Sequence, residues 1–103
     1  MIPNLDIAPE QLVAFCRTWQ IDELSVFGSV LRDDFHDGSD VDFLVRFSDE
    51  WVPTLFDIVR MEGELAKLVG RPVDIVMKLA VEESRNQYRR EAILSSYEIV
   101  YAA

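Results

Sequence analysis

Residues 28–47 read GSVLRDDFHDGSDVDFLVRF, and this stretch decides the fold. Its second part, Asp40–Phe47, alternates with a period of two, which predicts a β-strand whose successive side chains point to opposite faces. The face that we expect to be buried carries Val41, Phe43, Val45 and Phe47. The opposite face opens with two acids, Asp40 and Asp42. A core strand that presents two carboxylates at its start is therefore the first expectation.

Helical and strand patterns flank this stretch on both sides. They predict, in chain order, a helix over 9–19, a strand over 23–27, a helix over 55–69, a strand over 72–77, a helix over 81–94 and a strand over 97–101. The helix over 55–69 is the best bounded, because Thr54 and Asp57 have the spacing of a capping box and Gly70 suits a C-terminal cap. We expect a single domain over 1–103 with an α/β (α+β) fold, in which helices pack on one face of a small mixed sheet.

The net charge of the chain limits which partners it can bind. The 103 residues include ten Lys/Arg and nineteen Asp/Glu, a formal net charge of -9. Such an excess of acid argues against direct binding of nucleic acid or of an anionic membrane, since phosphate contacts need clustered cations. With no apolar run near the roughly 20 residues of a membrane span, and no secretory signal pattern, we expect a soluble cytoplasmic protein. The lone Cys16 suits a small buried apolar residue on the first helix.

Three features carry candidate chemistry: the Gly28-Ser29 turn, the pair Asp40 and Asp42, and Asp74 inside the strand over 72–77. Each alone has an ordinary interpretation, as a tight turn, a solvated strand end or an edge-strand acid facing water. Together they suit a phosphate and metal site. Acids at i and i+2 share one face and repel unless a cation neutralises them, and a third acid from a neighbouring strand completes a set of oxygens suited to Mg²⁺. Two ions about 4 Å apart can stabilise the attacking and leaving oxygens of a phosphoryl transfer.

The spacing of these residues resembles that of the polymerase-β-like nucleotidyltransferases, and within them the single-domain minimal nucleotidyltransferases (MNT). The family motif is Gly-Ser, ten residues, then Asp-x-Asp, and here Gly28-Ser29 is followed by Asp40 and Asp42 at that spacing. Such a match would arise by chance in about one chain in a thousand of this length. Asp74 and Arg32 stand where the family has a third acid and commonly an arginine. The resemblance covers nearly the whole chain.

The resemblance implies transfer of a nucleoside monophosphate from a nucleoside triphosphate to a hydroxyl, with release of pyrophosphate. By position, Gly28 and Ser29 would hold the β- and γ-phosphates, and Asp40 and Asp42 would bind two Mg²⁺ ions. Asp74 would bind the catalytic ion and help to deprotonate the acceptor. Arg32 would reach a phosphate or orient the loop, unless it is only a solvated charge.

Single-domain members of this kind resemble antitoxins encoded beside HEPN-family ribonuclease toxins, where they transfer AMP from ATP to a tyrosine of the toxin. Because we expect no extra domain to bind the acceptor, the toxin would present it. The expected assembly is a homodimer or a hetero-oligomer with the toxin. Two other interpretations stay open. The chain could neutralise the toxin by binding alone, as a catalytically silent antitoxin, or it could modify a small molecule such as an antibiotic. An acidic domain without site chemistry is the remaining alternative.

Two tryptophans, three arginines and one histidine each have both a functional and a structural interpretation. Trp19 and Trp51 could stack on adenine, but packing in the core or at its edge is the expected role. The basic residues Arg85, Arg89 and Arg90 could touch a partner or the nucleotide, but a solvated helical face is expected. His36 lies in the polar loop of the motif, where it could approach the nucleotide or simply face solvent.

Overall fold

The computed structural model describes residues 7–31, 40–48 and 51–103, with only the backbone at Ser29. The elements in chain order are α1 (Pro9–Thr18), β1 (Ile21–Phe27), the 3₁₀ turn η1 (Gly28–Leu31), β2 (Val41–Phe47), α2 (Leu55–Val69), β3 (Val73–Met77), α3 (Lys78–Glu82), α4 (Gln87–Leu94) and β4 (Tyr97–Ala102). Across these residues no helix has both the length and the apolar character needed to cross a membrane.

The strands form one mixed sheet in the order β3-β2-β1-β4. The β1 strand pairs antiparallel with both β2 and β4, whereas β2 pairs parallel with β3. Because a parallel pair needs a long crossover, α2 returns the chain from the end of β2 to the start of β3. The expected α/β (α+β) class with a small mixed sheet is therefore confirmed.

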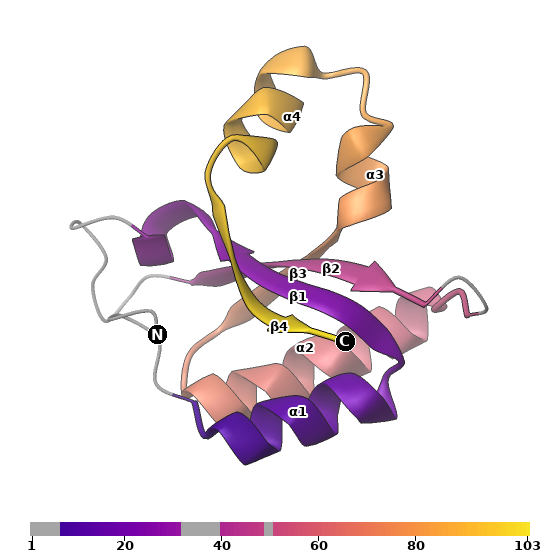
Figure 1. Cartoon of the computed structure of the whole chain (residues 1–103), viewed down its shortest axis with the longest axis vertical. Helices are drawn as coiled ribbons and strands as arrows, with labels where there is room; N and C mark the ends of the chain where they lie inside the picture. The colour runs from indigo at the N-terminus through magenta and orange to yellow at the C-terminus, as the bar shows by residue number, and fades with distance from the viewer. Residues whose placement is uncertain (1–6, 32–39, 49–50) are drawn as a thin grey trace.

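One face of the sheet packs on α1 and α2, which lie side by side beneath it in Figure 1. The alternation in β2 is confirmed, since Val41, Phe43, Val45 and Phe47 are all buried in this main core. Each helix adds a buried stripe of its own, from Leu12, Phe15 and Cys16 in α1 and from Met61 and Leu65 in α2. Burial raises the pKa of the Cys16 thiol to about 12, because the thiolate would lose its hydration. Cys16 is thus the small buried residue that the sequence predicts.

The ends of α2 follow the sequence pattern closely. Thr54 Oγ1 accepts a hydrogen bond from the Asp57 N–H at 3.2 Å, and Asp57 Oδ2 accepts one from the Thr54 N–H at 2.8 Å, which completes the capping box. At the other end Gly70 adopts φ 73°, a left-handed conformation that a residue with a Cβ rarely takes. Both boundaries of the predicted helix are confirmed.

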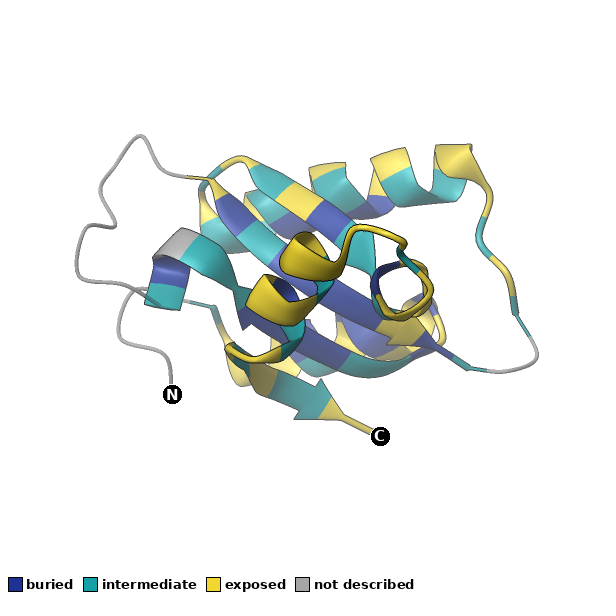
Figure 2. Cartoon of the chain, turned by 90° about the horizontal axis from the view of Figure 1, so that it is seen from above, coloured by how far each residue is buried: buried dark blue, intermediate teal, exposed yellow. Residues whose placement is uncertain are grey.

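The opposite face of the sheet is partly covered, which the expectation of helices on one face did not include. Here α3 and α4 pack over Leu44, through a smaller buried cluster with Val81 and Ile93. Figure 2, seen from this side, shows the two short helices in front of the sheet with largely exposed outer surfaces. Leu44 is therefore buried although it shares a face with Asp42 and Arg46.

The continuous helix predicted over 81–94 is wrong. The chain forms α3 immediately after β3, breaks, and begins α4 at Gln87. The break lies at polar residues whose side chains compete for backbone groups. The Asn86 side chain accepts from the Arg89 N–H at 3.1 Å and so caps α4, while Arg90 Nη1 donates to the Ser84 carbonyl at 3.1 Å.

Lys78 connects distant parts of this second face. Its Nζ donates to Glu23 Oε1 at 2.8 Å and to the Tyr97 hydroxyl at 3.2 Å, and it lies 4.8 Å from the centre of the Tyr97 ring. The Lys78 and Glu23 side chains are only 15% and 14% exposed. The hydrogen bond to Glu23 is the main reason that the pKa of Lys78 is raised above its usual 10.5. The contact links β1, the start of α3 and β4.

Replacing Lys78 by Met should lower the free energy of unfolding by about 1–3 kcal/mol, because Glu23 loses the partner that compensates its burial. Since the folded pKa of Lys78 is raised, the contribution of its ammonium is complete below pH 10.5 and is lost as the pH rises past the folded value. Urea denaturation should therefore separate the two proteins at pH 7, and the difference between them should shrink as the pH rises above 10.5. The matched change at exposed Lys67 should have little effect, and an equal loss there would contradict the assignment.

Candidate active site

The candidate site begins where β1 ends. Phe27 is paired with Asp42 across the antiparallel β1–β2 ladder, and Gly28 follows at φ 77° as the chain turns into η1. The predicted Gly28-Ser29 turn at the end of a strand is thus confirmed as backbone. The pairing places this turn next to Asp42.

Gly28 is required at this position for a second reason besides its φ angle. A Cβ on Gly28 would lie 2.7 Å from Asp42 Oδ2, closer than such atoms approach in proteins. The missing side chain therefore leaves the space that the Asp42 carboxylate occupies. The turn and the carboxylate form one unit, in which the backbone of the turn approaches an acid directly.

The second acid comes from the parallel neighbour of β2. Asp74 is the register partner of Asp42, so the two residues are adjacent across the strand spacing of about 4.8 Å and point to the same face. Asp42 is half-buried, whereas Asp74 is exposed because β3 is an edge strand. The sheet thus pairs two of the three predicted acids.

Asp40 lies just before β2 and is exposed. It precedes Asp42 by two residues, and the alternation of an extended chain would give both side chains the same direction. Among the residues described, no group of three Asp, Glu, His or Cys side chains converges closely enough to hold a metal ion. The pair Asp42 and Asp74 still suits Mg²⁺, which binds through one or two carboxylates and takes its other ligands from water and substrate phosphates.

The other predicted residues are placed as follows. Arg32 and His36 lie outside the described residues, and Ser29 is described by its backbone alone. Trp19 is buried, with its ring 6.3 Å from Trp51, and Trp51 meets Phe47 edge-on at 5.2 Å. Both tryptophans therefore pack at the edge of the core, as expected.

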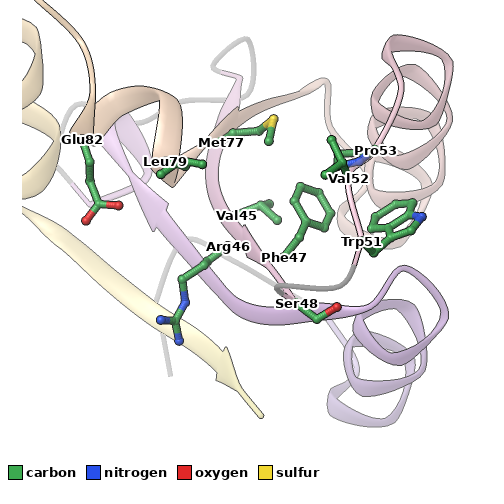
Figure 3. A pocket seen from close by; sticks show the side chains of 10 residues that line it. All are labelled: Val45, Arg46, Phe47, Ser48, Trp51, Val52, Pro53, Met77, Leu79 and Glu82. Carbon is green, nitrogen blue, oxygen red and sulfur yellow. The ribbon is translucent and has the colours of Figure 1, made fainter.

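A cavity of about 270 Å³ lies at the other end of β2 and is lined by residues such as Val45, Phe47 and Met77 (Figure 3). It contains none of the predicted acids, and its lining is largely apolar. The candidate acids lie outside this cavity, and the strand register and the turn at Gly28 fix their positions. No local sequence pattern indicates this cavity, because its walls come from segments whose approach depends on tertiary packing.

Comparison with known proteins identifies the family to which this fold belongs. The chain belongs to the nucleotidyltransferase domain family, whose model matches residues 9–100. It is 40% identical over 60 residues to the protein adenylyltransferase MntA of Thermococcus cleftensis, a match that covers 58% of this chain and 59% of that protein. The chain therefore aligns with about three fifths of that relative's length.

Solved structures support the same family. A structure assigned as a minimal nucleotidyltransferase is 31% identical with a TM-score of 0.64, over 90% of this chain and 87% of that one. A toxin–antitoxin crystal structure with AMP-PNP has a TM-score of 0.70 at 15% identity, over 94% of this chain and 75% of that one. The second likeness concerns the fold. The resemblance to minimal nucleotidyltransferases is thus confirmed.

The contact between Gly28 and Asp42 can be tested against a glycine of the same conformation. Replacing either Gly28 or Gly70 by Ala should cost about 1–2 kcal/mol of unfolding free energy, because both have φ near 75°. Only Gly28→Ala would also push the Asp42 carboxylate away, since a Cβ at Gly70 meets nothing within 4 Å. We expect Gly28→Ala to weaken Mn²⁺ binding, measured by calorimetry with ATP present, by at least tenfold and Gly70→Ala to leave it unchanged. Equal Mn²⁺ affinities in the two variants would contradict this role of Gly28.

Proposed function

We propose that the chain is a Mg²⁺-dependent protein adenylyltransferase, which transfers AMP from ATP to a hydroxyl of a partner toxin. The observation that carries this proposal is the position of Asp42, beside Asp74 on the neighbouring strand and against the turn at Gly28. Two carboxylates next to a backbone turn suit a metal-bound polyphosphate better than an uncharged or basic ligand.

In the proposed reaction, the acceptor oxygen attacks the α-phosphorus of ATP. The bond from the α-phosphorus to the bridging oxygen breaks, pyrophosphate leaves, and the hydroxyl proton passes to a carboxylate or to water. Bound Mg²⁺ would neutralise the developing charge on the phosphate oxygens. Asp40 and Asp42 would hold the ions, of which there are two in this proposal. Asp74, more exposed and closer to the sheet edge, would add a ligand and accept the proton.

The turn would bind the nucleotide. Backbone N–H groups at the start of η1, at Gly28 and Ser29, would donate to the β- and γ-phosphates, as such groups do at helix N-termini and tight turns. Arg32 follows directly in the sequence and would add a cation to the same phosphates. The negative charge of the chain then makes bound Mg²⁺ necessary, since it offsets repulsion between the acids and ATP.

The acceptor in this proposal is a tyrosine of a HEPN-family toxin, and the chain acts as its cytoplasmic antitoxin. In this proposal the partner presents its own hydroxyl to the nucleotide. Support comes from the relative named as a protein adenylyltransferase and from the fold shared with a toxin–antitoxin structure containing a nucleotide analogue.

A second candidate is an antitoxin that silences the toxin by binding alone. It is supported by the fold that the chain shares with a toxin–antitoxin structure, since that likeness does not depend on transfer of AMP. The two candidates differ in whether AMP is transferred.

Replacing Asp40 and Asp42 together by Asn should abolish transfer, because the neutral amides hold Mg²⁺ poorly. The purified chain, Mg²⁺, labelled ATP and the toxin encoded beside it would be incubated, and the intact mass of both proteins measured. The wild-type chain should add one or more AMP units to the toxin, and the double variant should add none. Added mass with the double variant would contradict the metal assignment, and a silenced toxin without added mass would favour binding alone.

Replacing Asp74 by Asn should lower the rate of AMP transfer at least a hundredfold while ATP affinity changes less than threefold, because Asp74 acts on the acceptor side. Transfer would be followed by pyrophosphate release and affinity by calorimetry. Glu98→Gln is a matched control, since Glu98 is an exposed acid on the other edge strand, β4. Unchanged turnover with Asp74→Asn would place the third acid elsewhere.

A further inference from the structure

A groove at the end of β2 remote from the acids is the strongest feature that nucleotide chemistry leaves unused. Its cavity of about 270 Å³ lies between the segment 51–53 and the start of α3. Figure 3 shows side chains from both sides around it, with Phe47 and Met77 at the ends of β2 and β3. Val52 and Leu79 flank the opening and are 80% and 57% exposed. The groove is thus an open, largely apolar surface.

Exposed apolar side chains follow the lining segment 51–53 along the chain, on the first turns of α2, and form the α2 stripe. Leu55, Phe56 and Val59 are 79%, 84% and 59% exposed, and Val52 precedes them as a wall of the groove. Leu55 and Val59 are spaced i, i+4, so they share one helical face, as in helices that pack against another helix. Large apolar side chains this exposed, gathered beside a cavity, mark a binding surface more often than a solvated one.

Charge indicates which kind of partner fits. Glu82 lines the groove, exposed Glu83 follows it, and Asp57 lies in the first turn of the stripe helix. Arg46 also lines the groove, so the lining carries one base and one acid. Arg46 approaches Glu23 at 3.9 Å, and Arg60 lies 5.4 Å above the ring of Trp19. The net charge of -9 on the whole chain, together with Glu83 and Asp57 beyond the groove, favours a basic partner and disfavours a second copy of the same acidic chain.

We propose that the groove and the α2 stripe bind a helix of a basic partner protein, whose apolar side chains enter the groove between flanking Lys or Arg residues. The proposal rests on the proposed function, which supplies the toxin as that partner. Asp42 and Phe47 are five residues apart on β2, or about 17 Å at 3.3 Å per residue. Docking at one end of the strand therefore leaves the turn and acids at the other end open to ATP and to the acceptor hydroxyl.

The test measures affinity for the purified toxin encoded beside this chain, by calorimetry without nucleotide. Phe56→Asp and Leu79→Asp should each weaken binding at least tenfold, because each places a charge in the apolar contact. Both positions lie in the first turn of a helix, where an acid is compatible with the helix dipole, so the fold should persist. Ile99→Asp, at a 53% exposed position on β4, is the matched control and should change the affinity less than twofold.

A second pair of variants tests the charge of the partner. Glu82→Lys should weaken binding at least fivefold and reduce its dependence on salt, whereas Glu98→Lys, on the opposite edge strand, should do neither. Equal effects of Glu82→Lys and Glu98→Lys would show that only net charge matters and would overturn the groove as the site.

The outcomes separate this proposal from the proposed function. Groove variants that bind the toxin like wild type, or a wild-type chain that does not bind it, would overturn the docking surface. AMP transfer, read separately by intact mass, decides the enzyme assignment whatever the affinity. A wild-type dimer that Phe56→Asp converts to a monomer in sedimentation would assign the groove to a second copy and overturn the partner helix. Selective loss of toxin binding with no added mass on wild-type toxin would support the groove and contradict the transferase.

Discussion

The register between β1 and β2 is the constraint on which both the core and the candidate site depend. It pairs Phe27 with Asp42 and so brings Gly28 against the Asp42 carboxylate. A slip by one residue would exchange the faces of β2, turning Phe43 out of the core and Asp42 into it. Burial of a carboxylate among apolar side chains and exposure of a phenyl ring would each cost several kcal/mol. The free energy that fixes the core therefore also fixes where the acid points.

The position of the second acid depends on α2. Because β2 and β3 are parallel, their register follows from the length and packing of the helix between them. The capping box at Thr54 and Gly70 at the far end define that length, and Met61 and Leu65 bind the helix to the sheet. A further contact holds the edge, since Glu62 Oε2 accepts the Ile75 N–H at 2.9 Å. This bond occupies a donor of the edge strand, where an exposed N–H could pair with another chain.

The features that could be predicted from the sequence are those that depend on residues close together in the chain. The alternation in β2, the capping box of α2 and the glycine turn after β1 all depend on positions a few residues apart. The break between α3 and α4 was missed because residues 82–87 are all polar, so no apolar pattern marks where one helix ends and the next begins, while Ser84 and Asn86 redirect the backbone hydrogen bonds. The motif indicated Asp40 and Asp42 and placed Asp74 on a neighbouring strand, but the parallel register that pairs Asp74 with Asp42 is encoded by no local pattern. The contact of Lys78 with Glu23 could not be predicted either, because it joins residues far apart in the chain that only the tertiary fold brings together.

The two ends of β2 differ in polarity: its start carries an acid, and its end borders the apolar groove. At the start of the strand Asp42 and Asp74 remain accessible, which requires that no helix cover them. At its end Phe47 and Met77 are only partly enclosed by the segment 51–53 and Leu79, which leaves the groove. An apolar opening costs stability that the proposed partner would restore, whereas an acidic pair would gain from the proposed cation. The acidic pair and the groove lie about 17 Å apart on one strand, so the proposed cation and the proposed partner would bind without competing for the same surface.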